Sequence, residues 1–162
     1  FCGVIYAGLM IKPNGSISVL EYNVRLGDPE TQVGLPVCGG DFGETILACC
    51  KGDLDKIEWP APDRVALGVV MASGGYPDKY QTGFHIEIDG EETDNTYIYH
   101  AGTAHDNSGR LVTSGGRVLT VVGIGEDLKE AKELAYKRVG SVKFSGAHYR
   151  KDIGDKSLKG DI

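Results

Sequence analysis

Three side chains able to serve a metal ion and a phosphate follow one another at alternate positions near the start of the chain. Glu21, Asn23 and Arg25 form the pattern Glu-x-Asn-x-Arg, and alternate residues of a β-strand project from the same face. A carboxylate and an amide oxygen suit a hard cation such as Mg²⁺, which usually takes one or two carboxylates together with substrate phosphates. A guanidinium two residues further on would lie beside that cation, where its paired N–H donors bind a phosphate or a carboxylate. The pattern indicates metal-assisted chemistry on an anionic substrate.

The segment that follows stays polar. Asp28 and Glu30 flank a proline in the run Arg-Leu-Gly-Asp-Pro-Glu-Thr-Gln. Spacing alone leaves another interpretation open, in which the strand ends in an exposed ion pair. The continuous polar run favours a functional loop, because a structural loop seldom needs so many charged and amide side chains in succession.

Hydrophobic patterning places this cluster at the end of a β-hairpin. Residues 3–12 and 17–23 read as two strands joined by Pro13-Asn14-Gly15-Ser16, and Asn-Gly between apolar runs is a strong hairpin signal when both positions take positive φ. Strict alternation predicts four residues on one face of the second strand: Ile17, Val19, Glu21 and Asn23. We therefore expect Glu21 and Asn23 to project side by side.

A short helix and a linker complete the first part of the chain. Asp41 and Glu44 have the spacing of a capping box, apolar residues then recur at helical intervals, and Gly52 supplies the stop. Trp59-Pro60-Ala61-Pro62 reads as an extended linker, because proline disfavours helix in the residue before it. We place a domain boundary there and assign residues 1–60 to the first domain.

Short strands dominate the remaining sequence and predict an α+β domain over residues 63–155. The strands are expected at 65–73, 85–88, 97–104, 110–113 and 117–124, a spacing typical of a small mixed β-barrel or sandwich. A capping box at Asp127 opens one helix, which would pack against the strands and end at Gly140. Residues 156–162 are expected to form a solvated tail.

Composition argues against several classes of function. The formal charge of −6 arises from 17 Lys and Arg against 23 Asp and Glu, without a basic run, so a nucleic-acid partner is disfavoured. The four cysteines match neither a C-x-x-C pair nor a secreted disulfide framework, and they suit a reducing cytoplasm. No apolar stretch reaches the ~18 residues of a membrane span, and no signal-peptide pattern is present. The start at Phe1, within a strand-like run, predicts a piece of a longer polypeptide.

The run VLEYNVRLGDPETQ resembles the signature of the phosphoribosylamine–glycine ligases, also called glycinamide ribonucleotide synthetases, in the ATP-grasp superfamily. The resemblance continues in the family's order through VALGVVMASGGYP, YHAGTA, LVTSGGRVLTVV and FSGAHYRKDIG. It implies the C-terminal part of an ATP-grasp domain followed by a domain similar to the rudimentary single-hybrid motif of biotin carboxylase. The family joins glycine to 5-phosphoribosylamine in purine synthesis, and ATP is cleaved to ADP and phosphate through a glycyl phosphate. The N-terminal remainder of the enzyme would precede this chain, which we expect to be inactive alone.

The resemblance also implies roles for single residues. Glu21 and Asn23 match the family's Mg²⁺ or Mn²⁺ ligands. Arg25 matches the arginine placed against the acyl phosphate, which implies both catalysis and binding of the transferred phosphate. Asp28 and Glu30 match the acidic pair of the signature loop and are candidates for holding the glycine ammonium or for positioning the amine.

Two glycine pairs at strand junctions have two interpretations. Gly74-Gly75 and Gly115-Gly116 are typical of turns. Alternatively, Gly75, Gly116 and the neighbouring Arg117 face the ribose phosphate, since successive backbone amides form anion-binding concavities. Arg150 would similarly either face a phosphate or clamp the C-terminal segment.

Two other functions stay open on the sequence: a noncatalytic scaffold or binding module, and another ATP-grasp carboxylate–amine ligase. Mg²⁺-dependent ATP binding by the chain would contradict the scaffold. A different ligase would require a signature loop other than Arg-Leu-Gly-Asp-Pro-Glu. The sequence does not distinguish a stand-alone ligase from one part of a multifunctional purine enzyme.

Overall fold

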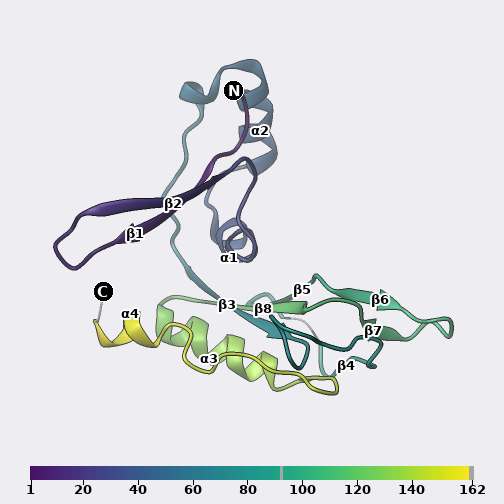
Figure 1. Cartoon of the computed structure of the whole chain (residues 1–162). Helices are drawn as coiled ribbons and strands as arrows, with labels where there is room; N and C mark the ends of the chain where they lie inside the picture. The colour runs from purple at the N-terminus through teal and green to yellow at the C-terminus, as the bar shows by residue number, and fades with distance from the viewer. Residues whose placement is uncertain (92, 161–162) are drawn as a thin grey trace. The chain divides into compact units, whose positions relative to one another are not determined.

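The computed structural model describes residues 1–91 and 93–160, and the chain divides between Pro62 and Asp63 into two units (Figure 1). In the first unit, strands β1 (Tyr6–Ile11) and β2 (Ile17–Asn23) form an antiparallel hairpin. Helix α1 (Glu30–Gly34) and the 3₁₀ turn η1 (Leu35–Val37) follow, and then helix α2 (Phe42–Lys51) and the 3₁₀ turn η2 (Leu54–Lys56).

The hairpin turn differs from the expected turn with two positive φ angles. Asn14 keeps a negative φ, whereas Gly15 has φ +79°. The backbone N–H of Gly15 donates to the carbonyl of Lys12 at 2.8 Å, so Pro13 and Asn14 are the two central residues of a β-turn. Proline is common at the first of these two positions. Gly15 then serves as the left-handed residue of a three-residue loop. The hairpin is therefore confirmed, but by a different turn.

A β-bulge at Leu20 changes which residues of β2 share a face. Gly8 pairs with Glu21 and Leu9 pairs with Val19, which leaves Leu20 as the extra residue. Because paired residues lie on the same face and neighbours on opposite faces, Val19 and Glu21 lie on opposite faces. The expected strict alternation is wrong at this point.

Helix α2 follows its sequence signals. The side chain of Asp41 accepts a hydrogen bond from the backbone N–H of Glu44 at 2.9 Å, and Gly52 ends the helix in the left-handed conformation. The apolar side chains of this unit are largely exposed, including those of Leu20 and Tyr22 on β2. Across residues 1–62, all of which are described, Ala48 is the only buried apolar side chain. The first unit therefore has little core of its own.

The second unit is built on a three-stranded antiparallel sheet in the order β3 (Val65–Ala72), β8 (Arg117–Gly125), β5 (Thr96–His100). Two smaller antiparallel pairs accompany it: β4 (Glu87–Ile88) with β9 (Val142–Lys143), and β6 (Thr103–His105) with β7 (Leu111–Thr113). Helix α3 (Leu128–Val139) runs along the sheet, and the short helix α4 (Asp155–Lys159) lies near the C-terminus (Figure 1). The expected mixture of short strands and one packed helix is confirmed.

Helix α3 packs so closely on β8 that two glycines of the strand are required. A Cβ on Gly123 would lie 2.4 Å from both the Ala131 carbonyl oxygen and the Ala135 nitrogen. A Cβ on Gly125 would lie 2.7 Å from the Ala131 nitrogen. Both alanines are fully buried, together with Val69 and Met71 of β3 and Val121 of β8. This helix–sheet contact forms the centre of the core.

Three sequence expectations for this unit need correction. The strand expected at 97–104 is two strands, because the chain turns at Gly102, whose N–H donates to Arg117 and whose carbonyl accepts from Ser114. The strand β9 was not expected, since two residues carry no periodic pattern. Helix α4 occupies residues 155–159 and so overlaps the first four residues of the expected tail 156–162, and residues 161–162 lie outside the described part of the chain.

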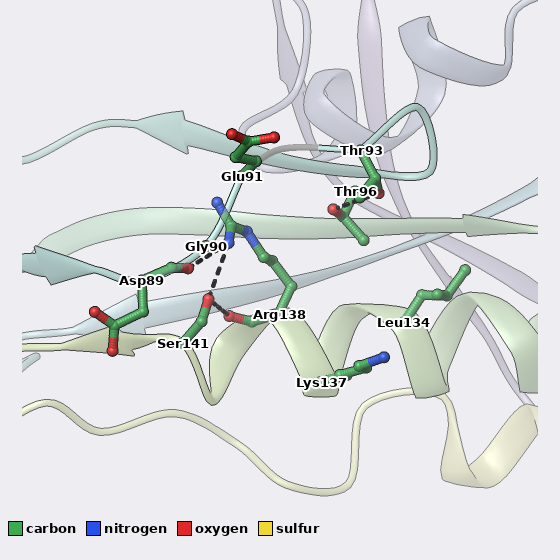
Figure 2. A pocket seen from close by; sticks show the side chains of 9 residues that line it. All are labelled: Asp89, Gly90, Glu91, Thr93, Thr96, Leu134, Lys137, Arg138 and Ser141. Carbon is green, nitrogen blue, oxygen red and sulfur yellow. Dashed lines mark hydrogen bonds between the residues drawn. The ribbon is translucent and has the colours of Figure 1, made fainter.

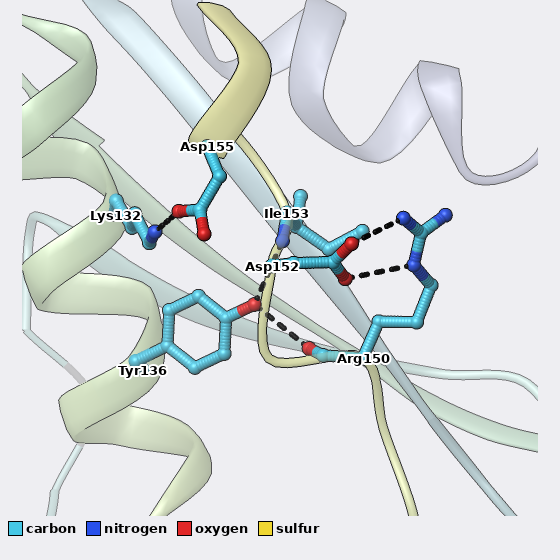
Figure 3. Close-up of polar contacts among 6 residues, drawn as sticks. All are labelled: Lys132, Tyr136, Arg150, Asp152, Ile153 and Asp155. Carbon is cyan, nitrogen blue, oxygen red and sulfur yellow. Dashed lines mark hydrogen bonds and ion pairs between the residues drawn. The ribbon is translucent and has the colours of Figure 1, made fainter. Parts of the chain in front are cut away.

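Tyr136 fixes the C-terminal segment to α3 (Figure 3). Its hydroxyl donates to the Arg150 carbonyl at 2.7 Å and accepts from the Ile153 N–H at 3.2 Å. An ion pair between Lys132 and Asp155 adds a second attachment. The Arg150 guanidinium donates to both carboxylate oxygens of Asp152, at 2.9 and 2.7 Å. The structure thus supports the clamp interpretation of this segment.

Within the described residues, no single helix is both long and apolar enough to span a membrane, although the bent pair Glu30–Val37 and Phe42–Lys51 together meets those criteria.

Candidate functional site

The end of β2 presents the three residues of the Glu-x-Asn-x-Arg pattern as one hydrogen-bonded chain. The Asn23 amide nitrogen donates to Glu21 Oε1 at 3.1 Å. The Asn23 amide oxygen accepts from Arg25 Nη2 at 3.3 Å, while Arg25 Nη1 donates to the Leu26 carbonyl at 2.9 Å. Glu21 and Arg25 are exposed, and Asn23 is half-buried. The predicted grouping of these three side chains is therefore present despite the bulge.

The donor set of Glu21 and Asn23 fits a hard cation after one local change. The amide oxygen of Asn23 is turned toward Arg25, and its nitrogen faces the Glu21 carboxylate. Turning the amide by about 180° would place a carboxylate oxygen and an amide oxygen side by side, the ligands that Mg²⁺ takes. No cluster of three or more His, Cys, Asp and Glu side chains that could hold a metal occurs among residues 1–91 and 93–160. A cation here would therefore draw its other ligands from water or from a bound phosphate.

Tyr6 connects the signature loop to this face of the hairpin. Tyr6 pairs with Asn23 in the sheet register, and its hydroxyl donates to Glu30 Oε1 at 2.9 Å. This hydrogen bond, with some burial and the negative charges of Glu30 and Glu21, raises the pKa of Tyr6, and the positive charge of Arg25 opposes the shift. The pKa of Tyr6 is therefore raised by carboxylates of both the strand, Glu21, and the loop, Glu30.

Tyr6 is not among the residues predicted from the sequence. The register of the expected hairpin, which places this residue opposite Asn23, is the signal that would have identified it.

The loop itself is held by its own polar side chains. The Gln32 amide nitrogen donates to Asp28 Oδ1 at 2.9 Å, and the Thr31 hydroxyl donates to the Gly27 carbonyl. Gly27 is buried, and a Cβ there would collide with the Glu30 side chain at 2.4 Å. Asp28 and Glu30 themselves are exposed at the start of α1. Glu30 joins the hairpin face through Tyr6, whereas Asp28 is placed by Gln32.

The other candidate residues, Gly75, Gly116 and Arg117, lie in the second unit. Gly75 has φ +97°, and a Cβ there would lie 2.2 Å from the Lys79 carbonyl oxygen. The ring of Tyr76 occupies the space that a Cβ on Gly116 would need, at 2.3 Å. Close packing therefore favours glycine at both positions, against its own turn at Gly75 and against the Tyr76 ring at Gly116, and Arg117 is exposed at the start of β8.

Two family models of one synthetase match this chain, and one of them covers the hairpin and most of the loop. The family model described as the phosphoribosylglycinamide synthetase C domain matches residues 66–156, and the model of the ATP-grasp (A) domain of the same synthetase matches residues 1–31. The second match covers the hairpin, the Glu-x-Asn-x-Arg pattern and the start of the signature loop. The first unit is thus similar to part of the ATP-grasp domain of this synthetase, and the second unit is similar to its C domain.

Individual relatives are similar over nearly the whole chain. The phosphoribosylamine–glycine ligase of Chlorobaculum tepidum is 47% identical over 160 residues, which cover 98% of this chain and 37% of the relative. The bifunctional purine biosynthetic protein purD of Dictyostelium discoideum is 43% identical, over 98% of this chain and 20% of the relative. The crystal structure of the Thermotoga maritima phosphoribosylamine–glycine ligase superposes with a TM-score of 0.80 and 42% identity, over 92% of this chain and 36% of that one.

The chain belongs to the phosphoribosylglycinamide synthetase family. It spans between one fifth and two fifths of the length of the relatives it matches.

Proposed function

We propose that this chain is the C-terminal portion of an ATP-dependent phosphoribosylamine–glycine ligase of the reducing cytoplasm. The observation that carries the proposal is the hydrogen-bonded run Glu21, Asn23 and Arg25 on a hairpin whose sequence matches the ATP-grasp model of that synthetase. The substrates would be ATP, glycine and 5-phosphoribosylamine, as the name of the similar ligases indicates. The product would be glycinamide ribonucleotide, with ADP and phosphate released.

Glu21 and Asn23 would hold the divalent cation, Mg²⁺ or Mn²⁺. When bound, such an ion neutralises charge on the nucleotide phosphates during transfer. Arg25 lies two residues along the same strand, and its guanidinium is already turned toward Asn23. It would stabilise negative charge on the phosphoryl group that passes to the glycine carboxylate. Its hydrogen bond to the Leu26 carbonyl helps to hold it in that position.

Asp28 and Glu30 would bind the glycine ammonium or position the attacking amine. Both carboxylates are exposed yet held by neighbours, Asp28 by Gln32 and Glu30 by Tyr6. A carboxylate that already accepts one hydrogen bond retains lone pairs for a second donor. An ammonium group could therefore bind Glu30 without breaking its contact with Tyr6.

The first unit would be completed by the N-terminal remainder of the ligase. Its hairpin exposes apolar side chains such as Leu9, Val19 and Leu20, which are about half exposed or more. Exposed apolar patches of this kind mark interaction surfaces. The ligase relatives extend well beyond the matched region, which supports a large additional segment.

The second unit would supply the C-terminal domain of the ligase. We propose that its three sheets form a barrel similar to the single-hybrid motif, with the backbone near Gly75 and Gly116 and the Arg117 guanidinium facing the ribose phosphate. The exposure of Arg117 at the start of β8, next to Gly116, supports this assignment.

A chimaera tests the proposal. The part of the Chlorobaculum tepidum ligase that precedes the matched region is joined to this chain, and formation of ADP is measured with glycine and 5-phosphoribosylamine present. We expect activity that requires all three substrates and Mg²⁺. Glu21→Gln should reduce kcat/KM by on the order of 100-fold at limiting Mg²⁺, with partial recovery at high Mg²⁺. Glu58→Gln, which alters an exposed carboxylate of the same unit, is the matched control.

A folded chimaera that is inactive, or a Glu21→Gln variant with full activity at limiting Mg²⁺, would contradict the proposal.

A further inference from the structure

A pocket in the second unit lies apart from every residue discussed as a site so far. It has a volume of about 260 Å³ and is bounded by the end of α3 and by the loop between β4 and β5 (Figure 2). Leu134, Lys137 and Arg138 line it from the helix, and Asp89 and Thr96 are among the residues that line it from the loop side.

Arg138 is the residue that distinguishes this pocket from an ordinary surface hollow. Only 8% of it is exposed. Its Nη1 donates to the Asp89 carbonyl at 2.7 Å and to the Ser141 hydroxyl oxygen at 3.2 Å, and that hydroxyl donates in turn to the Arg138 carbonyl at 2.7 Å. The guanidinium is thus fixed through one of its terminal nitrogens, as Figure 2 shows.

The other edge of the guanidinium has a donor without a partner. The Nε of Arg138 is buried and has no hydrogen-bond acceptor within the described residues. Leaving a buried donor of a charged group unpaired is strongly unfavourable. The N–H groups of Nε and Nη2 lie along one edge of the planar guanidinium, and this edge binds both oxygens of a carboxylate.

The surrounding side chains restrict what the pocket can accept. The Asp89 carboxylate is turned away to Lys143, at 3.0 Å, so it does not neutralise Arg138. The hydroxyls of Thr93 and Thr96 hydrogen-bond to each other at 3.0 Å, and Leu134 adds an apolar side chain to the lining.

Two charged groups complete the lining. Glu91 contributes a negative charge and Lys137 a positive one. The positive charges of Arg138 and Lys137 favour binding of an anion. The negative charge of Glu91 disfavours binding of a doubly charged anion such as a phosphate, so a singly charged anion fits this lining better.

We propose that this pocket binds a small monocarboxylate with a short apolar body, its two oxygens on the Nε and Nη2 edge of Arg138 and its body against Leu134. The volume admits a molecule of a few carbon atoms and excludes a nucleotide. The site needs neither ATP nor the cation of the hairpin, so it stands whether or not the proposed ligase activity is correct.

Nuclear magnetic resonance of the whole chain tests the site directly. Butyrate is titrated while the Nε–H signal of Arg138 is followed, and butyramide, the neutral amide of the same size, is titrated in parallel. We expect the Arg138 signal to shift and to saturate at millimolar butyrate, with at least a tenfold weaker response to butyramide.

Two variants keep the proposal falsifiable if the arginine itself is needed for folding. Leu134→Phe fills the apolar side and leaves Arg138 in place; it should weaken butyrate binding at least tenfold. Lys129→Ala, which removes an exposed charge at the other end of α3, should bind as the parent does. An unmoved Nε–H signal, an equal response to butyramide, or full binding by the Leu134→Phe variant would overturn the proposal.

Discussion

Replacing Gly123 by alanine should weaken the second unit. The added Cβ would lie 2.4 Å from two backbone atoms of α3, the Ala131 carbonyl oxygen and the Ala135 nitrogen. Ordinary contact distances are about 3.5 Å, so the helix must move by about 1 Å from the sheet. No rotamer change can relieve the collision, because both atoms belong to the helix backbone.

The free energy of unfolding should fall accordingly. Overpacking of a core typically costs about 1–3 kcal/mol, and a collision with two backbone atoms belongs at the upper end of that range. Alanine also lowers the conformational entropy of the unfolded chain, which raises the free energy of unfolding by about 0.5–1 kcal/mol. The net loss of about 2 kcal/mol corresponds to a melting temperature lower by about 8–16 °C for a domain of this size.

Circular dichroism of the whole chain, with hydrogen exchange of the β8 amides, measures this loss. Gly140→Ala is the matched control, because Gly140 has helical φ and a Cβ there would meet the Lys137 carbonyl oxygen at 3.3 Å, a contact that a small shift relieves. Its melting temperature should change by only a few degrees. A Gly123→Ala protein that melts with the parent and keeps its β8 protection would refute the close contact of helix and strand.

Two further predictions concern titration. The pKa of Tyr6 should lie above the usual range because its hydroxyl donates to Glu30, and nuclear magnetic resonance of protein labelled with ¹³C at tyrosine measures it. The Glu30→Ala variant should have a Tyr6 pKa closer to the usual value. An unchanged titration in this variant would show that the hydrogen bond is not formed in solution. The Ser108 hydroxyl, together with the backbone N–H of Arg110, holds the pKa of Asp106 below its ordinary value. Asp106 therefore stabilises the fold above its unfolded pKa of about 3.9, and this contribution is lost as the pH falls below that value. At pH 7 the melting temperature of the parent should be higher than that of the Asp106→Asn variant, and this difference should be smaller at pH 3. A difference in melting temperature that does not change with pH would contradict this role.

The elements that position the candidate site could be predicted because their signals are local. Proline and Asn-Gly at the turn, the apolar runs that flank it and the caps of α2 and α3 each depend on residues close in sequence. The structure confirms the hairpin and both helices, although the turn type and the alternation of β2 differ from the expectation. The grouping of Glu21, Asn23 and Arg25 follows from a period of two over five residues, so the bulge at Leu20, which lies before them, leaves it intact.

The features that the sequence did not reveal depend on distant neighbours. The bulge at Leu20 arises from pairing with Gly8 and Leu9 across the hairpin. The bond from Tyr6 to Glu30 joins residues 24 positions apart. Neither leaves a periodic signal in the sequence.

Arg138 illustrates the same limit in the second unit. A basic residue in the last turn of a helix usually faces solvent, where it interacts favourably with the helix dipole. Here the loop after β4 covers it, and the Asp89 carbonyl, 49 residues away, accepts its hydrogen bond. Tertiary packing, not helical periodicity, determines that this guanidinium is buried.

The most direct test of the central claim is a Mn²⁺ titration, followed by electron paramagnetic resonance, of the chimaeric ligase with a non-hydrolysable ATP analogue bound. We predict that the parent binds Mn²⁺ together with the analogue, and that Glu21→Gln and Asn23→Ala each weaken this binding by at least tenfold while Glu58→Gln does not. Unchanged Mn²⁺ affinity in both site variants would show that the end of β2 is not the cation site, and the proposed role of this hairpin would be wrong.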